Sequence, residues 1–132
     1  MLGWFIARPA TLGLQAGALR PCPRTPNCVC SEPGTPAGAL VAPFPAPAGM
    51  AEMTRLAAVV GAWPRTKVIT AGDGYLHAET TSLLLRFVDD LEFRLDAAAG
   101  VIHVRSASRV GRGDLGVNRK RLEALRAVWL QR

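Results

Sequence analysis

The sequence predicts an α+β fold: a single two-layer domain in which two helices cover one face of an antiparallel sheet of four to five strands. Two stretches, 49–62 and 115–130, show apolar residues at helical spacing. Between them, residues 66–109 alternate apolar and polar side chains and are interrupted by glycine turns, as antiparallel strands are. Nine of the ten prolines precede residue 48, so residues 1–48 are expected to form a Pro-rich arm rather than part of the sheet interior.

The first helix is expected over 49–62, where it is ended by Gly61 and Pro64. Its apolar stripe at i, i+3, i+4 and i+7 consists of Met53, Leu56, Ala57 and Val60. The strands are expected at 67–71, 75–80, 85–95 and 101–109, with a glycine hairpin turn at 72–74. The closing helix, 115–130, begins after the capping residue Asp114. Its apolar side is formed by Leu122, Leu125 and Trp129, with Ala124 and Val128 beside them.

The expected division is therefore an arm over 1–48, with a short edge strand at 39–44, and an α+β domain over 49–132. This element order resembles TATA-binding-protein-like and helix-grip folds in topology. Such a likeness of fold implies no function.

The net charge of +6 is concentrated at the C-terminal end of the chain. Residues 105–132 carry seven Arg and one Lys against Asp114 and Glu123. A basic patch attracts anions, but nucleic acid is an unlikely partner because aromatic residues do not interleave with the charge. No apolar run reaches the roughly 20 residues of a transmembrane span, and the start lacks the features of a cleavable signal. We therefore expect a cytoplasmic or peripherally membrane-associated protein.

The open face of the sheet is expected to be polar, because side chains alternate along each strand. Its members would be His77, Glu79, Arg86, Asp90, Glu92, His103, Arg105 and Arg109. This surface is either a set of solvated ion pairs or a ligand surface on which His77, Glu79 and His103 act as acid–base groups. Asp89 breaks the alternation. It is expected to be an anchor held by Arg109 or Ser108, with a bulge as the alternative.

A glycine-rich turn precedes the closing helix and spells G-x-G-x-x-G at 111–116. We reject a dinucleotide site, because no parallel strand follows the helix. A helix N-terminus beside arginines still favours an anion, although a tight turn filled by Asp114 is an equal alternative. The candidate ligand residues are Arg105, Ser106, Ser108, Arg109, Gly111, Asp114, Gly116 and Asn118.

Cys22, Cys28 and Cys30 lie together in the arm. Without an export signal, reduced structural thiols are the preferred interpretation. A Cys22–Cys28 disulfide in an oxidising compartment is the alternative. The spacing C-x5-C-x-C is not typical of zinc sites, so neither a metal nor a cofactor is expected.

Four stretches together resemble the domain-of-unknown-function 1499 family of bacteria and plant plastids. They are LGLQAGALRPCPRTPNCVCSE near the start, YLHAE at 75–79, RFVDDLEF at 86–93 and RSASRVGRGDLGVNRKR at 105–121, and the resemblance covers about residues 12–128. The family usually has an aromatic residue and Ser where this chain has Arg112-Gly113, which implies that the G-x-G-x-x-G spelling is accidental. It often has Ser where this chain has Cys30, which argues against a three-thiol metal site. Many relatives look exported or lumenal, and the resemblance implies no activity.

The leading hypothesis is a binding or accessory protein, not an enzyme, for a small anionic ligand or a protein partner. One alternative is a hydrolase or isomerase that uses His77, Glu79 and His103. The other is a structural subunit that docks through its N-terminal arm.

Overall fold

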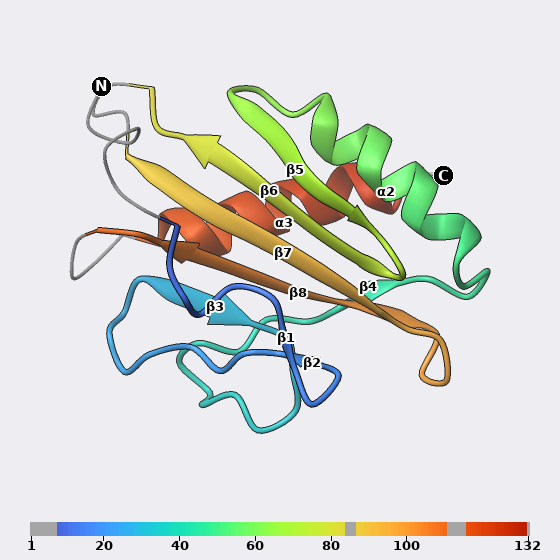
Figure 1. Ribbon diagram of the computed structural model, residues 1–132, viewed down its shortest axis with the longest axis horizontal. Coiled ribbons are helices and arrows are strands. Elements are labelled where there is room, and N and C mark those ends of the chain that lie inside the picture. Colours follow the sequence, from blue (N-terminus) through green and yellow to red (C-terminus); the bar gives the residue numbers. More distant parts are fainter. Residues whose placement is uncertain (1–7, 84–86, 111–115, 132) are drawn as a thin grey trace.

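The computed structural model describes residues 8–83, 87–110 and 116–131. Two helices pack on a six-strand antiparallel sheet in which β3, β8, β7, β6 and β5 follow one another and β4 also pairs with β8 (Figure 1). The α+β class and the two helices are therefore confirmed. The sheet has six strands rather than the expected four or five, because the N-terminal residues contribute two.

The four long strands lie close to their predicted positions. They are β5 (Thr66–Gly72), β6 (Tyr75–Thr81), β7 (Val88–Asp96) and β8 (Val101–Ser108). Between β5 and β6, Asp73 and Gly74 have φ angles of 53° and 76°. These positive angles form the tight turn that the sequence predicted, since Asp and Gly tolerate the left-handed conformation better than other residues.

The helices are α2 (Ala51–Gly61) and α3 (Val117–Trp129). The predicted α3 residues Leu122, Leu125 and Trp129 are fully inaccessible to solvent. In the predicted α2 stripe, Leu56 and Val60 are also fully inaccessible, whereas Met53 and Ala57 are partly buried against the core. Ala124 and Val128 are exposed and do not belong to the buried side. The helices and the apolar side of the sheet enclose one hydrophobic core.

The first strands come from the N-terminal segment, defined here as residues 8–48. They are a separate hairpin of β1 (Leu14–Gln15) and β2 (Ala18–Leu19), and the sheet strands β3 (Cys28–Cys30) and β4 (Phe44–Pro45). The edge strand predicted at 39–44 is wrong in extent: Leu40 makes one isolated bridge to Cys30, and regular pairing with β8 lies on either side of it.

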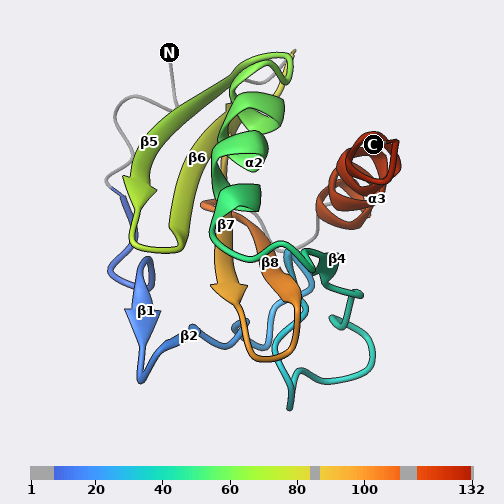
Figure 2. The ribbon, with the colours of Figure 1, turned by 90° about the vertical axis from the view of Figure 1, so that its right-hand side faces the viewer.

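The first part of the N-terminal segment, residues 8–21, lies against the face of the sheet opposite the helices (Figure 2). Its later residues extend the sheet as β3 and β4 and contact α3. Gly13, Leu19 and Pro21 make hydrogen bonds to side chains of that face or of the adjoining loop. The prediction of an open polar face is therefore wrong. The apolar periodicity identified which side chains share this face, but carried no signal that the segment would lie across it.

Candidate functional site

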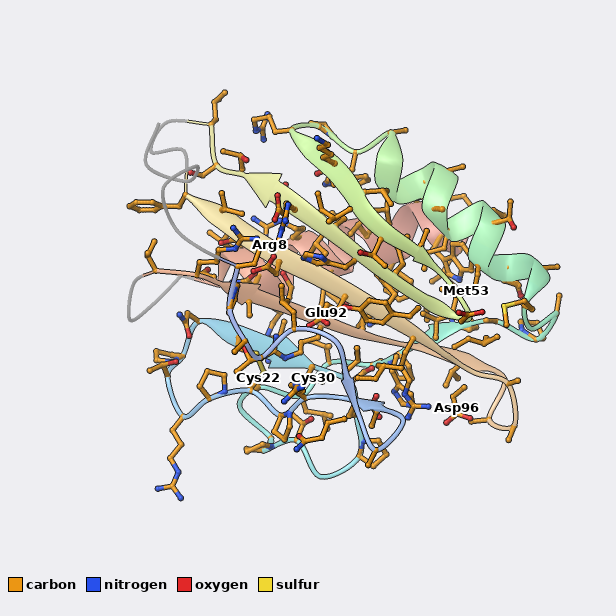
Figure 3. All side chains as sticks on the ribbon, in the orientation of Figure 1. Arg8, Cys22, Cys30, Met53, Glu92 and Asp96 are labelled. Carbon is orange, nitrogen blue, oxygen red and sulfur yellow. A yellow bond between two sulfur atoms is a disulfide. The ribbon has the colours of Figure 1, made fainter. Side chains whose placement is uncertain are left out.

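The polar side chains of the sheet form a buried layer beneath the N-terminal segment. Figure 3 shows Arg8 and Glu92 on this face, between the segment and the strands. Its most enclosed members have exposed fractions of 6% or less; they are His77, Asp90, Glu92, His103 and Arg105. Arg86, which was predicted to join them, lies outside the described residues. Buried charges need partners, and the contacts of this layer form three clusters.

The first cluster centres on Arg109. Its Nε and Nη2 atoms donate to the two Asp90 oxygens at 2.8 Å each, and Nη2 also donates to Glu79. Arg8 donates to Glu79 at 2.6 Å, and His77 Nε2 lies 2.7 Å from Asp90. Burial would raise the pKa of both carboxyls, but the hydrogen bonds and charges of their cationic neighbours outweigh it and hold each pKa below its ordinary value.

His77, Glu79 and Asp90 also have the residue types of a metal site, with candidate ligand atoms within 4.8 Å of one another. The carboxylates already hold the guanidinium of Arg109, and hydrogen bonding by Asp90 and Glu79 raises the pKa of that group despite its burial. A metal ion would have to displace this cation. The arrangement is that of a buried ion-pair network rather than an open coordination site.

The second cluster surrounds His103 on β8. Its Nδ1 lies 3.0 Å from Ser31 Oγ, and its Nε2 lies 3.6 Å from Asp96. This serine–histidine contact was missed in the sequence because Ser31 lies 72 residues earlier. Ser31 Oγ also accepts the Val104 N–H at 2.8 Å, and both side chains are at least 94% buried. The hydroxyl therefore connects the N-terminal segment to β8.

The predicted acid–base trio does not form one cluster. His77 and Glu79 lie on β6, whereas His103 lies on β8, with β7 between them. Adjacent strands are about 4.8 Å apart, so the two imidazoles start from backbones roughly 10 Å apart. Each imidazole has its own acidic neighbour, Asp90 or Asp96.

The third cluster is built on Glu92, which is fully buried. Glu92 accepts hydrogen bonds from Tyr75 Oη at 2.5 Å, the Gly13 N–H at 2.8 Å and Arg105 Nη1 at 3.4 Å. Burial first, and then the Glu92 carboxylate, raise the pKa of Tyr75. Arg105 also donates to the Pro21 carbonyl at 3.4 Å, and its Nε has no hydrogen-bond partner among the described residues.

The candidate ligand residues predicted from the sequence lie on both sides of the sheet. Arg105 and Arg109 belong to the buried layer, whereas Ser106 and Asn118 lie on the helix side, where the Ser106 hydroxyl donates to Asn118 at 2.5 Å. Asn118 also donates to Ser108 Oγ at 2.9 Å. Gly111 and Asp114 lie outside the described residues.

Asp89 is also on the helix side, where Arg121 Nη2 lies 2.7 Å from its carboxylate. Arg109, its predicted partner, instead holds Asp90. The pairing of β7 with β8 runs without a shift through Asp89 and Asp90, so the alternative of a bulge at this point is wrong.

Cys22 and Cys28 form a disulfide, the alternative that the sequence left beside reduced thiols. Cys30 is a free thiol on the same strand as Cys28 and is fully buried. Burial raises the pKa of the Cys30 thiol despite nearby hydrogen bonds and the charge of Arg105. A high pKa keeps this thiol protonated and unreactive.

A pocket of about 430 Å³ lies between the disulfide and the start of α3, and we call it the disulfide pocket. Its lining residues are Cys22, Pro23, Arg24, Thr25, Pro26, Cys28, Val29, Pro36, Gly38, Ala39, Gly116 and Arg119. Among these described lining residues, the charged ones are two arginines. Neither Arg24 nor Arg119 was among the ligand residues predicted from the sequence, although Arg24 lies between the two bonded cysteines and Arg119 lies in the basic stretch.

Fold and site together define a small α+β protein with a buried polar layer and a basic pocket beside a disulfide. The chain belongs to a family of proteins of unknown function, DUF1499, whose model matches residues 18–128. No curated protein and no solved structure matches the chain. Within the described residues, neither helix has the length and apolar character needed to cross a membrane.

Proposed function

We propose that this protein is a non-enzymatic binding protein for a small anionic molecule, which it holds in the disulfide pocket. One observation carries the proposal: the described charged residues that line this pocket, Arg24 and Arg119, are both cations. The buried layer on the sheet is different, because its arginines face carboxylates of their own chain.

The position of Arg119 supports an anion in this pocket. Its Nη1 and Nη2 donate to the carbonyls of Leu40 and Gly38 at 3.0 Å each. These contacts fix the guanidinium and use two of its five N–H groups, which leaves donors for a ligand. Gly116, at the N-terminus of α3, also lines the pocket, and the positive end of the helix dipole adds to the favourable potential.

The other two hypotheses have weaker support. The separation of His77 from His103 by one strand counts against a hydrolase or isomerase that uses both groups. The hydrogen bonds that join Arg8 to Glu79, Gly13 to Glu92 and Glu32 to Arg94 tie the N-terminal segment to β6 and β7, and they count against a segment that is free to dock elsewhere.

The proposal includes two finer expectations from the sequence. The topology is TATA-binding-protein-like or helix-grip-like, with residues 1–48 as a Pro-rich arm. The second expectation is a location in the cytoplasm or at a membrane periphery, and the Cys22–Cys28 disulfide counts against the cytoplasm because structural disulfides persist in oxidising compartments. A pocket that faces solvent suits a ligand taken up from an aqueous compartment.

The test begins with native mass spectrometry of the full chain, purified gently with its disulfide intact, and continues with calorimetric titration of inorganic phosphate and straight-chain alkyl carboxylates. The matched variants are Arg24→Gln, which removes a charge from the pocket, and Lys120→Gln, which removes an exposed charge from α3 outside the pocket lining. We expect Arg24→Gln to weaken binding of the tightest anion about fivefold, equivalent to about 1 kcal/mol for one exposed ion pair. Lys120→Gln should bind as the unchanged protein does. Absence of binding by every anion, or equal effects of the two variants, would contradict the proposal.

A further inference from the structure

We propose that the ligand of the disulfide pocket is amphipathic: a carboxylate joined to an apolar alkyl body. This inference rests on the proposed function and specifies the chemical class of the ligand. It comes from the size of the pocket, the distribution of charged and apolar residues over its walls, and two exposed apolar residues that follow lining residues in the chain.

The pocket is larger than an anionic group requires. Its volume of about 430 Å³ lies within the range of roughly 300–1,000 Å³ that holds drug-sized organic ligands. A bare carboxylate or phosphate held by Arg119 would leave most of this space to water. A ligand with an organic body would displace that water from the lining.

Most of the remaining lining is apolar. The lining residues include Pro23, Pro26, Pro36 and Ala39, together with Cys22 and Cys28 of the disulfide. Transfer of an alkyl chain from water onto such a surface is favourable by about 0.8 kcal/mol for each fully buried methylene, which is close to fourfold in affinity.

Arg119 and the apolar lining residues come from different elements. Gly116 and Arg119 belong to the start of α3, whereas the prolines and the disulfide belong to the N-terminal segment. A carboxylate at the helix end therefore places its alkyl chain along the proline wall. Arg24, in the loop between the bonded cysteines, adds a second cation beside that wall.

Two exposed large apolar residues directly follow lining residues in the chain. Leu40 follows Ala39 in the N-terminal segment, Val117 follows Gly116 at the start of α3, and each is 44% exposed. Apolar residues therefore continue in sequence from both elements that line the pocket.

The walls are also rigid before a ligand binds. Proline has a fixed φ, and the disulfide closes the loop that carries Pro23 and Pro26. A preformed wall loses little conformational entropy on binding. Little of the free energy gained from apolar contact is therefore offset by the cost of ordering the wall.

The experiment is a calorimetric chain-length series on the full chain with its disulfide intact: acetate, butanoate, hexanoate, octanoate and decanoate, with inorganic phosphate as the purely polar anion. We expect affinity to rise by up to about fourfold per methylene until the pocket is filled, and to exceed that of phosphate for the longer members.

Gly38→Leu tests whether the series reports this pocket. Gly38 lines the pocket and has no left-handed φ, and a Cβ built on it meets no heavy atom within 4 Å, so the backbone at this position admits a side chain. We expect Gly38→Leu to reduce octanoate affinity at least tenfold while leaving thermal stability unchanged. Ala97→Leu, in the exposed turn between β7 and β8, should change neither.

The outcomes separate the two proposals. Equal affinities across the carboxylate series, together with phosphate binding that depends on Arg24, would overturn the alkyl-carboxylate class and leave the anion-binding function standing. A chain-length dependence that Gly38→Leu does not alter would also overturn the assignment to this pocket. Absence of binding by phosphate and by every carboxylate would overturn both.

Discussion

Arg109 illustrates how much a single residue of the buried layer contributes to the stability of the fold. Its guanidinium is bonded to Asp90 and Glu79, and its side chain is only 4% exposed. Asp90 is 2% exposed. If Arg109 is removed, the ionisable partner that remains for Asp90 among the described contacts of this cluster is His77. Removal of one member of a buried ion pair costs more than the pair itself contributes, because the other charge remains buried.

We expect Arg109→Ala to lower the free energy of unfolding by about 3 kcal/mol. Urea denaturation followed by circular dichroism measures the change. Lys67→Ala removes an exposed cation from β5 and should change stability by no more than about 0.5 kcal/mol. Equal stability of Arg109→Ala and the unchanged protein would show that the Arg109 contacts contribute no net stability.

Asn118 has a corresponding role on the helix side of the sheet. It is fully buried in the first turn of α3, where it accepts from Ser106 and Arg121 and donates to Ser108 and to the Asn27 carbonyl. These contacts join α3 to β8 and to the N-terminal segment.

We expect Asn118→Leu to destabilise the protein by about 2 kcal/mol, because its buried polar neighbours lose their partner while the volume of the site is kept. Thermal unfolding measures the loss. Lys120→Leu, an exposed position on the same helix, serves as the control. A similar change in both variants would mean that the polar contacts of Asn118 are dispensable.

Among the elements, β3 gives little sequence signal although two of its residues, Cys28 and Val29, line the disulfide pocket. It has only three residues, and its partner strand lies more than 70 residues away. The long strands and both helices could be predicted because their apolar periodicity is local. A three-residue strand in a proline-rich stretch offers no period to detect, so neither the sixth strand nor the pocket beside it followed from the sequence.

The disulfide fixes the loop next to this short strand. In the chain-entropy model, closing a loop of this length stabilises the folded state by about 2 kcal/mol. Cys22→Ser combined with Cys28→Ser should lower stability by about this amount and weaken octanoate binding, because Pro23 and Pro26 lose their fixed positions. Calorimetry and thermal unfolding measure the two effects.

Dithiothreitol provides the control for the disulfide prediction. It should produce the same changes in the unchanged protein and none in the double variant. Binding that is unaffected by reduction would show that the prolines alone hold the pocket wall.

In the whole molecule, the helices lie on one side of the sheet and residues 8–21 lie on the other (Figure 2). The hydrophobic core occupies the helix side, and the buried polar layer occupies the other side. The alternation of side chains predicted which residues face this layer. It did not predict their burial, because contacts such as that of Arg94 with Glu32 join residues 62 positions apart. A proline-rich segment resembles a solvated arm in sequence. Here it is held by the pairing of β3 and β4 with β8, by the burial of Val29, Val41, Phe44 and Ala46 in the hydrophobic core, and by hydrogen bonds to acidic side chains.

Those acidic side chains make the covering of the sheet sensitive to acid. Arg94, the Leu19 amide and nearby positive charges lower the pKa of Glu32 despite its burial, as the cationic neighbours of Glu79 and Asp90 do for theirs. A carboxyl whose pKa is lower in the folded state binds its proton more readily in the unfolded chain. Stability from these groups is therefore complete above the ordinary carboxyl values of 3.8–4.5 and is lost as the pH falls below them.

We expect the contribution of these carboxyls to the melting temperature to be constant between about pH 8 and 5 and to fall steeply below about pH 4. Glu79→Gln removes one such carboxyl and should lower stability at pH 7 but much less at pH 3, so that its acid-induced loss is smaller. Glu123→Gln, whose carboxyl is 52% exposed beside Arg126, should follow the curve of the unchanged protein. Scanning calorimetry across this range measures all three curves. If Glu79→Gln loses as much stability between pH 7 and pH 3 as the unchanged protein does, the contacts of Glu79 with Arg8 and Arg109 do not contribute to the acid-induced loss of stability.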